Sequence, residues 1–318
     1  MAERYYLGAD GGGTKTTVRV SDSKGKIVAE VVGGSINFYS EGMERARENM
    51  ANIIAELKVN NPDIEIYSAF IGMSALYKRA TEKECADFFT GVIDAPCAFM
   101  DSDLFIALEA MGLEGECAVM ICGTGSMIAG RKKDGSIIVK GGYGYILGDE
   151  GSGYNLGLAG IKRGVAAFEG AKSPTALVDA IREYYKVEDL HELIDIFYDP
   201  PMERSAIADF ARVVFKCAES GDEAAIELVK FEAEEAALTA AALLREFDEP
   251  ISLGVYGGMF QHHKIYTDFF TDKLNSIIAT KEIKLLPMPP VNGAILAALR
   301  ESGTEITDEI LNNLKEAK

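Results

Sequence analysis

Residues 5–20 read YYLGADGGGTKTTVRV, and this stretch decides the fold. An apolar run at 5–9 is followed by Asp10, three glycines and a threonine, and a second apolar run begins at Thr17. A polar turn at 22–25 and a third apolar run at 27–32 complete the pattern. Short apolar runs separated by glycines and polar turn residues are typical of β-strands joined by tight connections. The sequence therefore predicts a strand, a glycine loop, a strand, a turn and a third strand.

The same order of elements returns further along the chain. Residues 118–139 read AVMICGTGSMIAGRKKDGSIIV, which again gives a run, a glycine loop, a run, a turn and a run. Corresponding residues lie 110 positions apart in both loops and both turns: Gly13 and Gly123, Thr14 and Thr124, Gly25 and Gly135, Ile27 and Ile137. A register kept through loop, turn and strand favours duplication of one ancestral unit. Chance similarity at four positions is the alternative.

The remaining patterns divide the chain into two halves. The residues between the two copies fit a sheet with helices: a helix at 43–57, strands at 68–73 and 96–100, and a helix at 103–111. We expect an N-terminal domain at 1–114 and a larger, more helical C-terminal domain at 115–318. The last amphipathic segment, at about 292–300, is able to cross back to the first domain, and the sequence alone leaves this open.

Composition limits the functions that the chain can have. Its 318 residues include 50 acidic and 32 basic ones, which give a net charge of −18. This charge argues against nucleic acid as a partner, and it requires that any phosphate be held by local groups such as loop amides. The N-terminus lacks the apolar core of a signal peptide, and no run approaches the roughly 20 apolar residues that cross a bilayer. We therefore expect a cytoplasmic protein that does not contact membranes.

The two glycine loops indicate where the chemistry lies. A strand that ends in Asp10 and three glycines exposes backbone amides where a bulky side chain would block an approaching anion. The Walker pattern G-x-x-x-x-G-K-[ST] is absent, so this is a different kind of phosphate loop. A glycine hairpin with a purely structural purpose is the alternative. The second loop, 123–126, weakens that alternative, because two such hairpins are able to face each other across a cleft.

Paired hairpin loops in a duplicated chain resemble the actin, Hsp70 and sugar-kinase superfamily, in which ATP lies between two halves. Residues 141–154, GGYGYILGDEGSGY, are similar to the G-D-E-G-S segment of N-acetylglucosamine kinases within the BadF/BadG/BcrA/BcrD ATPase family. The resemblance extends over nearly the whole chain. It implies an α/β fold of two duplicated, ribonuclease H-like (actin-like ATPase) domains with a central cleft.

The resemblance also implies a set of site residues. Asp10 would hold a water of the Mg²⁺ shell, as suits a cation that keeps several waters. The ATP would be bound by phosphate-loop residues and an adenosine loop: Gly12, Gly13, Thr14, Lys15, Thr124, Gly125, Gly257 and Gly258. The sugar would be bound by hydroxyl-matching polar groups and nearby loop residues: Asn37, Ser74, Asp103, Thr124, Gly142, Tyr143 and Asp149.

A sugar kinase of this kind needs a carboxylate that accepts the proton of the attacking hydroxyl. Asp103 is favoured, because Ala107 and Leu108 follow it as in the family pattern and because a helix N-terminus would keep it ionised. Asp101 is the alternative. An aspartate at a helix start also has a purely structural role as a cap. Ser102 departs from the Asn or Thr that the family commonly has before its catalytic Asp.

The leading hypothesis is therefore ATP-dependent phosphorylation of an amino sugar, most simply N-acetylglucosamine at its 6-hydroxyl. Glucosamine and N-acetylmuramic acid stay open as substrates, and so does a homodimer. The alternatives are an iron–sulfur activator ATPase of an acyl-CoA dehydratase or reductase, and a sugar sensor without catalysis. The adjacent pair His262-His263 is interpreted as solvated, and the Ala- and Glu-rich stretch 223–235 as a solvated helix face.

Overall fold

The computed structural model describes residues 3–77 and 79–317, and the chain forms two compact units. The first unit contains the residues up to Gly115 and those from Leu286 onward, and the second is Glu116–Leu285. The expected domains were 1–114 and 115–318, with the return of a segment near 292–300 left open. In the structure the whole stretch from Leu286 belongs to the first unit.

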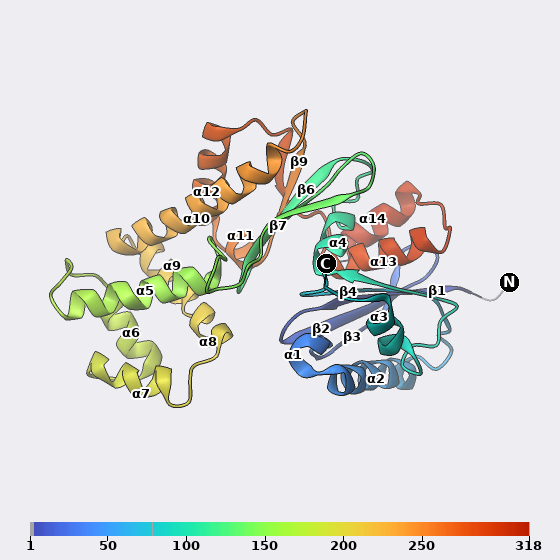
Figure 1. The fold of residues 1–318 in the computed structure, drawn as a ribbon, viewed down its shortest axis with the longest axis horizontal. Helices are drawn as coiled ribbons and strands as arrows, with labels where there is room; N and C mark the ends of the chain where they lie inside the picture. Colours follow the sequence, from blue (N-terminus) through green and yellow to red (C-terminus); the bar gives the residue numbers. More distant parts are fainter. Residues whose placement is uncertain (1–2, 78, 318) are drawn as a thin grey trace. The chain divides into compact units, whose positions relative to one another are not determined.

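The first unit is built on a mixed sheet with helices packed around it (Figure 1). The sheet has five strands in the order β3-β2-β1-β4-β5. Its strands are β1 (Tyr5–Gly11), β2 (Lys15–Ser21), β3 (Ile27–Gly34), β4 (Ile66–Met73) and β5 (Cys97–Ser102). The pairs β1–β2 and β2–β3 are antiparallel, whereas β1–β4 and β4–β5 are parallel. The predicted order of strand, glycine loop, strand, turn and strand is confirmed for β1, β2 and β3.

Helices cover both faces of this sheet. One apolar cluster joins Leu7 and Ala9 of β1 to the helices α1 (Phe38–Glu41), α2 (Met43–Asn60) and α3 (Glu82–Phe89). A second cluster joins Tyr6 and Phe70 to α4 (Asp103–Glu109), α13 (Pro290–Glu301) and α14 (Asp308–Glu316). Because successive strand residues point to opposite faces, β1 is buried on both sides.

The second unit repeats this sheet. Its strand order is β8-β7-β6-β9-β10, with β6–β7 and β7–β8 antiparallel and β6–β9 and β9–β10 parallel. The strands are β6 (Cys117–Cys122), β7 (Ser126–Arg131), β8 (Ile137–Gly141), β9 (Ser252–Tyr256) and β10 (Glu282–Leu285). Since β6 takes the place of β1 in an otherwise identical pairing scheme, the predicted duplicated α/β fold is confirmed.

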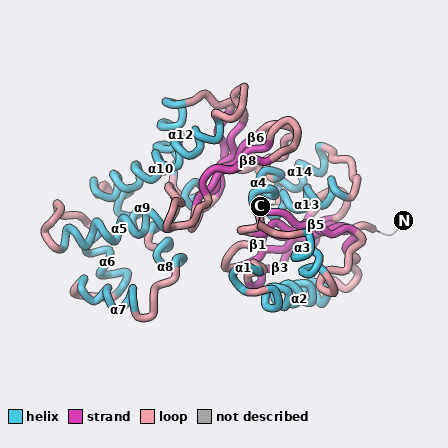
Figure 2. Tube along the Cα trace, in the orientation of Figure 1, coloured by secondary structure: helices cyan, strands magenta, loops and turns pink. Residues whose placement is uncertain are grey.

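Most of the second unit is helical (Figure 2). Its helices are α5 (Gly153–Phe168), α6 (Leu177–Tyr185), a short 3-10 turn at Leu190–Glu192, α7 (Leu193–Tyr198), α8 (Arg204–Asp209), α9 (Ala211–Glu219), α10 (Glu223–Leu244), α11 (Gly258–His262) and α12 (Lys264–Ile277). The interpretation of 223–235 as a solvated face is wrong for Glu232, which is buried in α10 together with Val229 and Ala233. Among the described residues, no helix combines the length and apolarity that a membrane span requires.

Candidate functional site

In the first unit, the candidate residues gather where the parallel strands end. Gly11 pairs with Met73, and Met73 pairs with Ser102, so the carboxyl ends of β1, β4 and β5 lie in one row. Loops that leave this edge of a sheet are the usual place for ligands in α/β folds. Asp10, Ser74 and Asp103 therefore come from one edge of the sheet, although up to 93 residues separate them in the chain.

The first glycine loop is a tight hairpin between β1 and β2. The Gly12 amide donates to the Lys15 carbonyl at 3.0 Å, which leaves Gly13, Thr14 and Lys15 exposed at its tip. A Cβ added at Gly13 would meet nothing within 4 Å, and its φ lies outside the left-handed region. The protein itself therefore does not require glycine at this position, whereas a closely approaching ligand would.

A hydrogen-bond network joins Asn37 and Ser74 to this loop. The buried Asn37 side chain caps α1 by accepting from the Tyr39 amide at 2.9 Å, and its Nδ2 donates to Ser74 Oγ at 3.1 Å. The Ser74 amide donates to the Gly11 carbonyl at 2.9 Å. The structure thus brings two residues predicted to bind sugar into contact, beside the predicted phosphate loop.

Two carboxylates share this edge. Burial raises the pKa of Asp10 to about 7, and the negative charge of Asp103 adds to the increase while Lys15 opposes it. Burial also raises the pKa of Asp103 to about 6, against hydrogen bonds from the backbone amides of Leu104 and Asp103 itself. Asp103 is the first residue of α4, and Ser102 caps that helix by accepting from the Phe105 amide at 3.4 Å. The two acids therefore lie within each other's field without full solvation.

Asp101 has different surroundings. Its Oδ1 accepts from the Ser102 amide at 2.5 Å. It also lines a pocket of about 540 Å³ together with Cys85 and Phe89 of α3. The negative charge that raises the pKa of Asp10 is that of Asp103, which favours Asp103 over Asp101 as the acidic neighbour of the Asp10 loop.

In the second unit, the glycine loop is supported by the start of α5. The Gly123 amide donates to the Gly125 carbonyl at 2.9 Å, which closes the β6–β7 hairpin. The Gly153 amide donates to the Gly123 carbonyl at 2.8 Å, and the Tyr154 amide donates to the Thr124 carbonyl at 3.3 Å. The loop carbonyls thus face α5, and Thr124 is exposed.

The Gly257-Gly258 pair follows β9, whose end lies beside the end of β6. Gly257 has a φ of 101°, and a Cβ there would approach the Cys122 carbonyl oxygen to 2.3 Å, so packing alone requires this glycine. Gly258 is exposed, and its Cβ would meet only His262 Cδ2, at 3.9 Å. Of the two, Gly258 is the one that leaves open space for a ligand.

Asp149 is buried and already surrounded by donors. Its φ of 64° is unusual for a residue with a side chain, and the amides of Ser126 and Gly144 donate to its carboxylate. Arg204 Nη2 donates to Asp149 Oδ2 at 2.6 Å. Burial raises the pKa of Asp149, and Arg204 partly offsets that effect. These donors thus hold the Asp149 carboxyl group in a fixed orientation.

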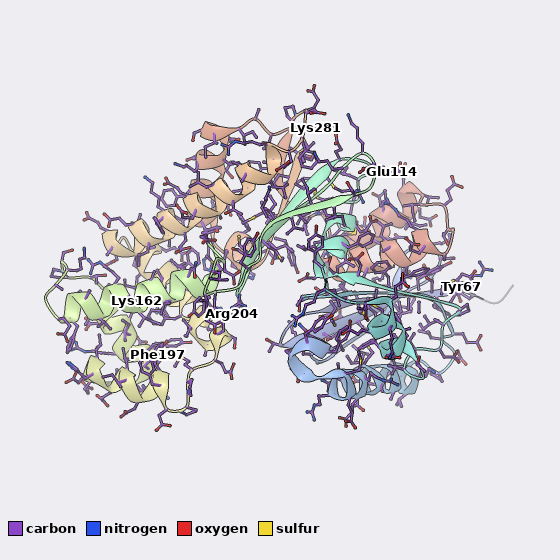
Figure 3. The ribbon with its side chains drawn as sticks, viewed as in Figure 1. Tyr67, Glu114, Lys162, Phe197, Arg204 and Lys281 are labelled. Carbon is purple, nitrogen blue, oxygen red and sulfur yellow. The ribbon has the colours of Figure 1, made fainter. Side chains whose placement is uncertain are left out.

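Arg204 is the site residue that the sequence did not indicate (Figure 3). It begins α8, 55 residues after Asp149, and no local motif marks it. A Cβ at Gly125 would approach Arg204 Nη2 to 2.2 Å, so the guanidinium lies directly against this glycine. The guanidinium also lies 5.6 Å from the centre of the Tyr145 ring. Only the tertiary fold brings Gly125, Tyr145 and Asp149 together around it.

Gly142 and Tyr143 lie in the loop that leads to Asp149. Gly142 has a φ of 73°, and its amide donates to the Ser126 carbonyl at 3.2 Å. Tyr143 is 75% exposed, and Ile146 and Leu147 are also exposed. The structure therefore places these two predicted sugar residues in the second unit, on a loop that is anchored to the second hairpin.

Known proteins resemble this chain over nearly its whole length. The model of the BadF/BadG/BcrA/BcrD ATPase family matches residues 7–300. An N-acetylmuramic acid/N-acetylglucosamine kinase from Clostridium acetobutylicum is 29% identical over 303 residues, 94% of this chain and 99% of the relative. An N-acetyl-D-glucosamine kinase from Dictyostelium discoideum is 26% identical, over 94% of this chain and 99% of the relative.

Solved structures share the fold. A candidate N-acetylglucosamine kinase from Chromobacterium violaceum superposes with a TM-score of 0.74 at 22% identity, covering 93% of this chain and 99% of that one. A ROK family glucokinase from Streptomyces griseus, solved with glucose and AMPPNP, gives 0.59 at 17% identity, covering 92% and 98%. These similarities establish the architecture of two related α/β units.

Proposed function

Because the chain belongs to the BadF/BadG/BcrA/BcrD ATPase family, we propose that it is an amino sugar kinase that phosphorylates N-acetylglucosamine at the 6-hydroxyl. The observation that carries this proposal is the match, over nearly the full length of both chains, to relatives named as kinases of N-acetylglucosamine and N-acetylmuramic acid. A third relative, from Vibrio cholerae, is named a glucosamine kinase. These names favour a kinase over an activator ATPase or a sensor. The use of ATP as the phosphate donor agrees with a cytoplasmic location for the enzyme.

In the proposed reaction, Asp103 accepts the proton of the sugar hydroxyl. The freed oxygen forms a bond to the γ-phosphorus of ATP while the bond from that phosphorus to the leaving oxygen of ADP breaks. A pKa of about 6 leaves the Asp103 carboxylate mostly ionised at neutral pH, yet basic enough to take a proton in the transition state. Asp101 stays the alternative base.

The site also fits a divalent cation. Asp10 and Asp103 are partly desolvated acids in each other's field, and burial with that charge raises the pKa of Asp10 to about 7. A cation near Asp10 would stabilise the ionised form of this buried carboxylate. Mg²⁺ prefers oxygen donors, which a carboxylate supplies. Asp10 would hold Mg²⁺ through a water, and the ion would neutralise charge on the ATP phosphates. This suits a chain whose net charge of −18 repels anions.

The proposed ligand contacts are those that the resemblance to the family implies. Residues of the two loops, Gly12 to Lys15 and Thr124 with Gly125, would bind the ATP phosphates, and the exposed Gly258 would lie against the nucleoside. Gly257 would shape that turn. Asn37, Ser74, Gly142, Tyr143 and Asp149 would bind the sugar.

An ADP-release assay on the purified chain tests the function. The panel contains N-acetylglucosamine, glucosamine, N-acetylmuramic acid, glucose and an acyl-CoA reductase partner. We expect release of one ADP per phosphorylated amino sugar, and much less release with glucose. Binding of sugar and ATP without turnover would instead support a sensor, and release that depends on the reductase alone would support an activator.

A further inference from the structure

The segment that carries Asp149 is held from behind by two buried side chains that the reaction does not use. We propose that Glu232 and Tyr266 are positioning residues, which fix the Gly151 peptide and through it both Asp149 and the second glycine loop. This inference rests on the proposed function, because Asp149 and that loop are its sugar and phosphate contacts in the second unit.

The two side chains bind opposite ends of one residue. Glu232 Oε2, on α10, accepts from the Gly151 amide at 2.8 Å, and the Tyr266 hydroxyl, on α12, donates to the Gly151 carbonyl at 2.7 Å. Glu232 is 6% exposed and Tyr266 is fully buried. A Cβ at Gly151 would approach Ala236 Cβ to 2.4 Å, so the peptide lies directly against α10. Gly151 is therefore fixed by hydrogen bonds and by close packing together.

Gly151 is connected to the site in both chain directions. On one side, the Ser152 amide donates to the Asp149 carbonyl at 3.1 Å, which closes the turn that gives Asp149 its φ of 64°. On the other side, Ser152 caps α5 by accepting from the Asn155 amide at 3.2 Å. The first two amides of α5, those of Gly153 and Tyr154, donate to the loop carbonyls of Gly123 and Thr124. A shift of Gly151 would thus move both Asp149 and the loop.

The choice of residue types supports a positioning role over simple packing. The neighbours of Glu232 on this face of α10 are Ala233, Ala236 and Ala237, so a leucine would satisfy the packing without burying an acid. A buried carboxylate is costly unless it accepts hydrogen bonds. The Gly151 amide in turn would be left without a partner in the interior if the acid were absent. The hydrogen bond between the Glu232 carboxylate and the Gly151 amide satisfies both groups, so neither is left unpaired in the interior.

The surroundings of Glu232 are acidic or neutral. Glu150 and Glu235 act on it with negative charge, and Tyr266 and the Cys122 thiol complete the buried group. Burial, together with the two acids, raises the pKa of Glu232 to about 7. Protonation leaves the carbonyl oxygen of the acid as an acceptor, so glutamine is the variant that keeps this contact without the charge.

The experiment compares Glu232→Leu, Glu232→Gln and Tyr266→Phe in the full-length chain. Glu227, exposed on the same helix, supplies the matched control Glu227→Leu. We measure thermal unfolding, then KM and kcat with N-acetylglucosamine as the probe sugar. Glu232→Leu is expected to raise the sugar KM at least about tenfold and to lower kcat. The reason is that the buried Gly151 amide loses its acceptor, so the Asp149 segment is no longer fixed. Glu232→Gln should restore KM and kcat to within a few-fold of wild type, and Glu227→Leu should match wild type.

Three results decide the inference. A folded Glu232→Leu protein with wild-type KM and kcat would overturn it, and so would a Gln variant as impaired as the Leu variant. If Glu232→Leu does not fold, Tyr266→Phe decides, because it removes only the hydroxyl: raised sugar KM supports positioning and unchanged kinetics overturn it. A wild-type chain that phosphorylates no amino sugar would instead contradict the proposed function, and sugar binding measured by calorimetry would then test the positioning role alone.

Discussion

The two aspartates near the end of β5 differ in what surrounds them, and this difference is our reason for proposing Asp103 as the base. Asp103 begins α4 and its charge acts on Asp10, whereas Asp101 accepts from the Ser102 amide and lines a pocket with α3. Asp103→Asn is expected to lower kcat by about 10² to 10⁴ with sugar and ATP affinities within a few-fold, the usual loss for a general base. Steady-state kinetics with Asp101→Asn alongside provide the measurement. An active Asp103→Asn with an inactive Asp101→Asn would transfer the role to Asp101.

The ionisation of Asp103 predicts the pH dependence of the reaction. Burial raises its pKa from an ordinary 3.8 to about 6, so the carboxylate is protonated below that pH and is then unable to accept a proton. The value of kcat/KM for the sugar is therefore expected to fall about tenfold per pH unit below about pH 6 and to be level above pH 7. A profile that stays level down to pH 4.5 would show that no group of raised pKa acts as the base.

Asp149 is expected to affect the sugar and not the nucleotide. Its carboxylate is held by Arg204 and by two backbone amides, so it is fixed before any ligand binds. Asp149→Ala should weaken sugar binding about tenfold or more, the order expected for a lost hydrogen bond to a charged acceptor, and leave ATP affinity within a few-fold. Calorimetric titration with each ligand separates the two effects. Unchanged sugar affinity would remove Asp149 from the sugar pocket.

Some of these residues were predicted through the resemblance to the family, which assigned them roles. Asn37, Ser74 and Asp103 each stand just after an apolar run, and the structure brings them to one edge of a sheet. Arg204 and Glu232 gave no such signal, since each reaches the site from a helix far along the chain. Their roles depend on tertiary packing, which local patterns do not contain.

At the level of elements, α13 is the helix whose place the sequence left open. It packs on β1 and against α4, the helix that Asp103 begins. The approach is close: a Cβ at Gly293 would lie 2.0 Å from the Ile106 carbonyl oxygen and 2.7 Å from the Ala110 amide nitrogen. Amphipathic periodicity predicted the helix itself but not the sheet that it covers, because an apolar face fits any apolar surface of the right shape.

The α4–α13 contact predicts the effect of Gly293→Ala. The added methyl group has no room between two helix backbones, so the helices must separate, and the free energy of unfolding is expected to fall by about 1–3 kcal/mol or more. Denaturant unfolding measures this loss. Gly13→Ala is the matched control, because its Cβ meets nothing within 4 Å and its stability should equal that of wild type. A Gly293→Ala protein as stable as wild type would contradict the close packing.

Over the whole molecule, the repeated sheet is the feature that the sequence predicted best. The loops and turns that lie 110 residues apart became β1–β3 and β6–β8, and in each unit the first strand also pairs in parallel with a later one. Those parallel partners, β4 and β9, are separated from β1 and β6 by very different lengths of chain, which hid the repeat beyond the third strand. Duplication explains why each unit has a glycine hairpin at the same place in its sheet.

The central claim is that the glycine loop of the first unit and the Gly257-Gly258 turn of the second unit bind ATP. Gly13 in the first unit and Gly258 in the second have open space at the position of a Cβ, so alanine there should disturb a ligand and not the fold. We would titrate wild type, Gly13→Ala and Gly258→Ala with a non-hydrolysable ATP analogue by calorimetry. We predict an affinity for the analogue that is lowered at least about tenfold in each variant, roughly 1.4 kcal/mol, and thermal unfolding that does not change. Full affinity in either variant would contradict this claim.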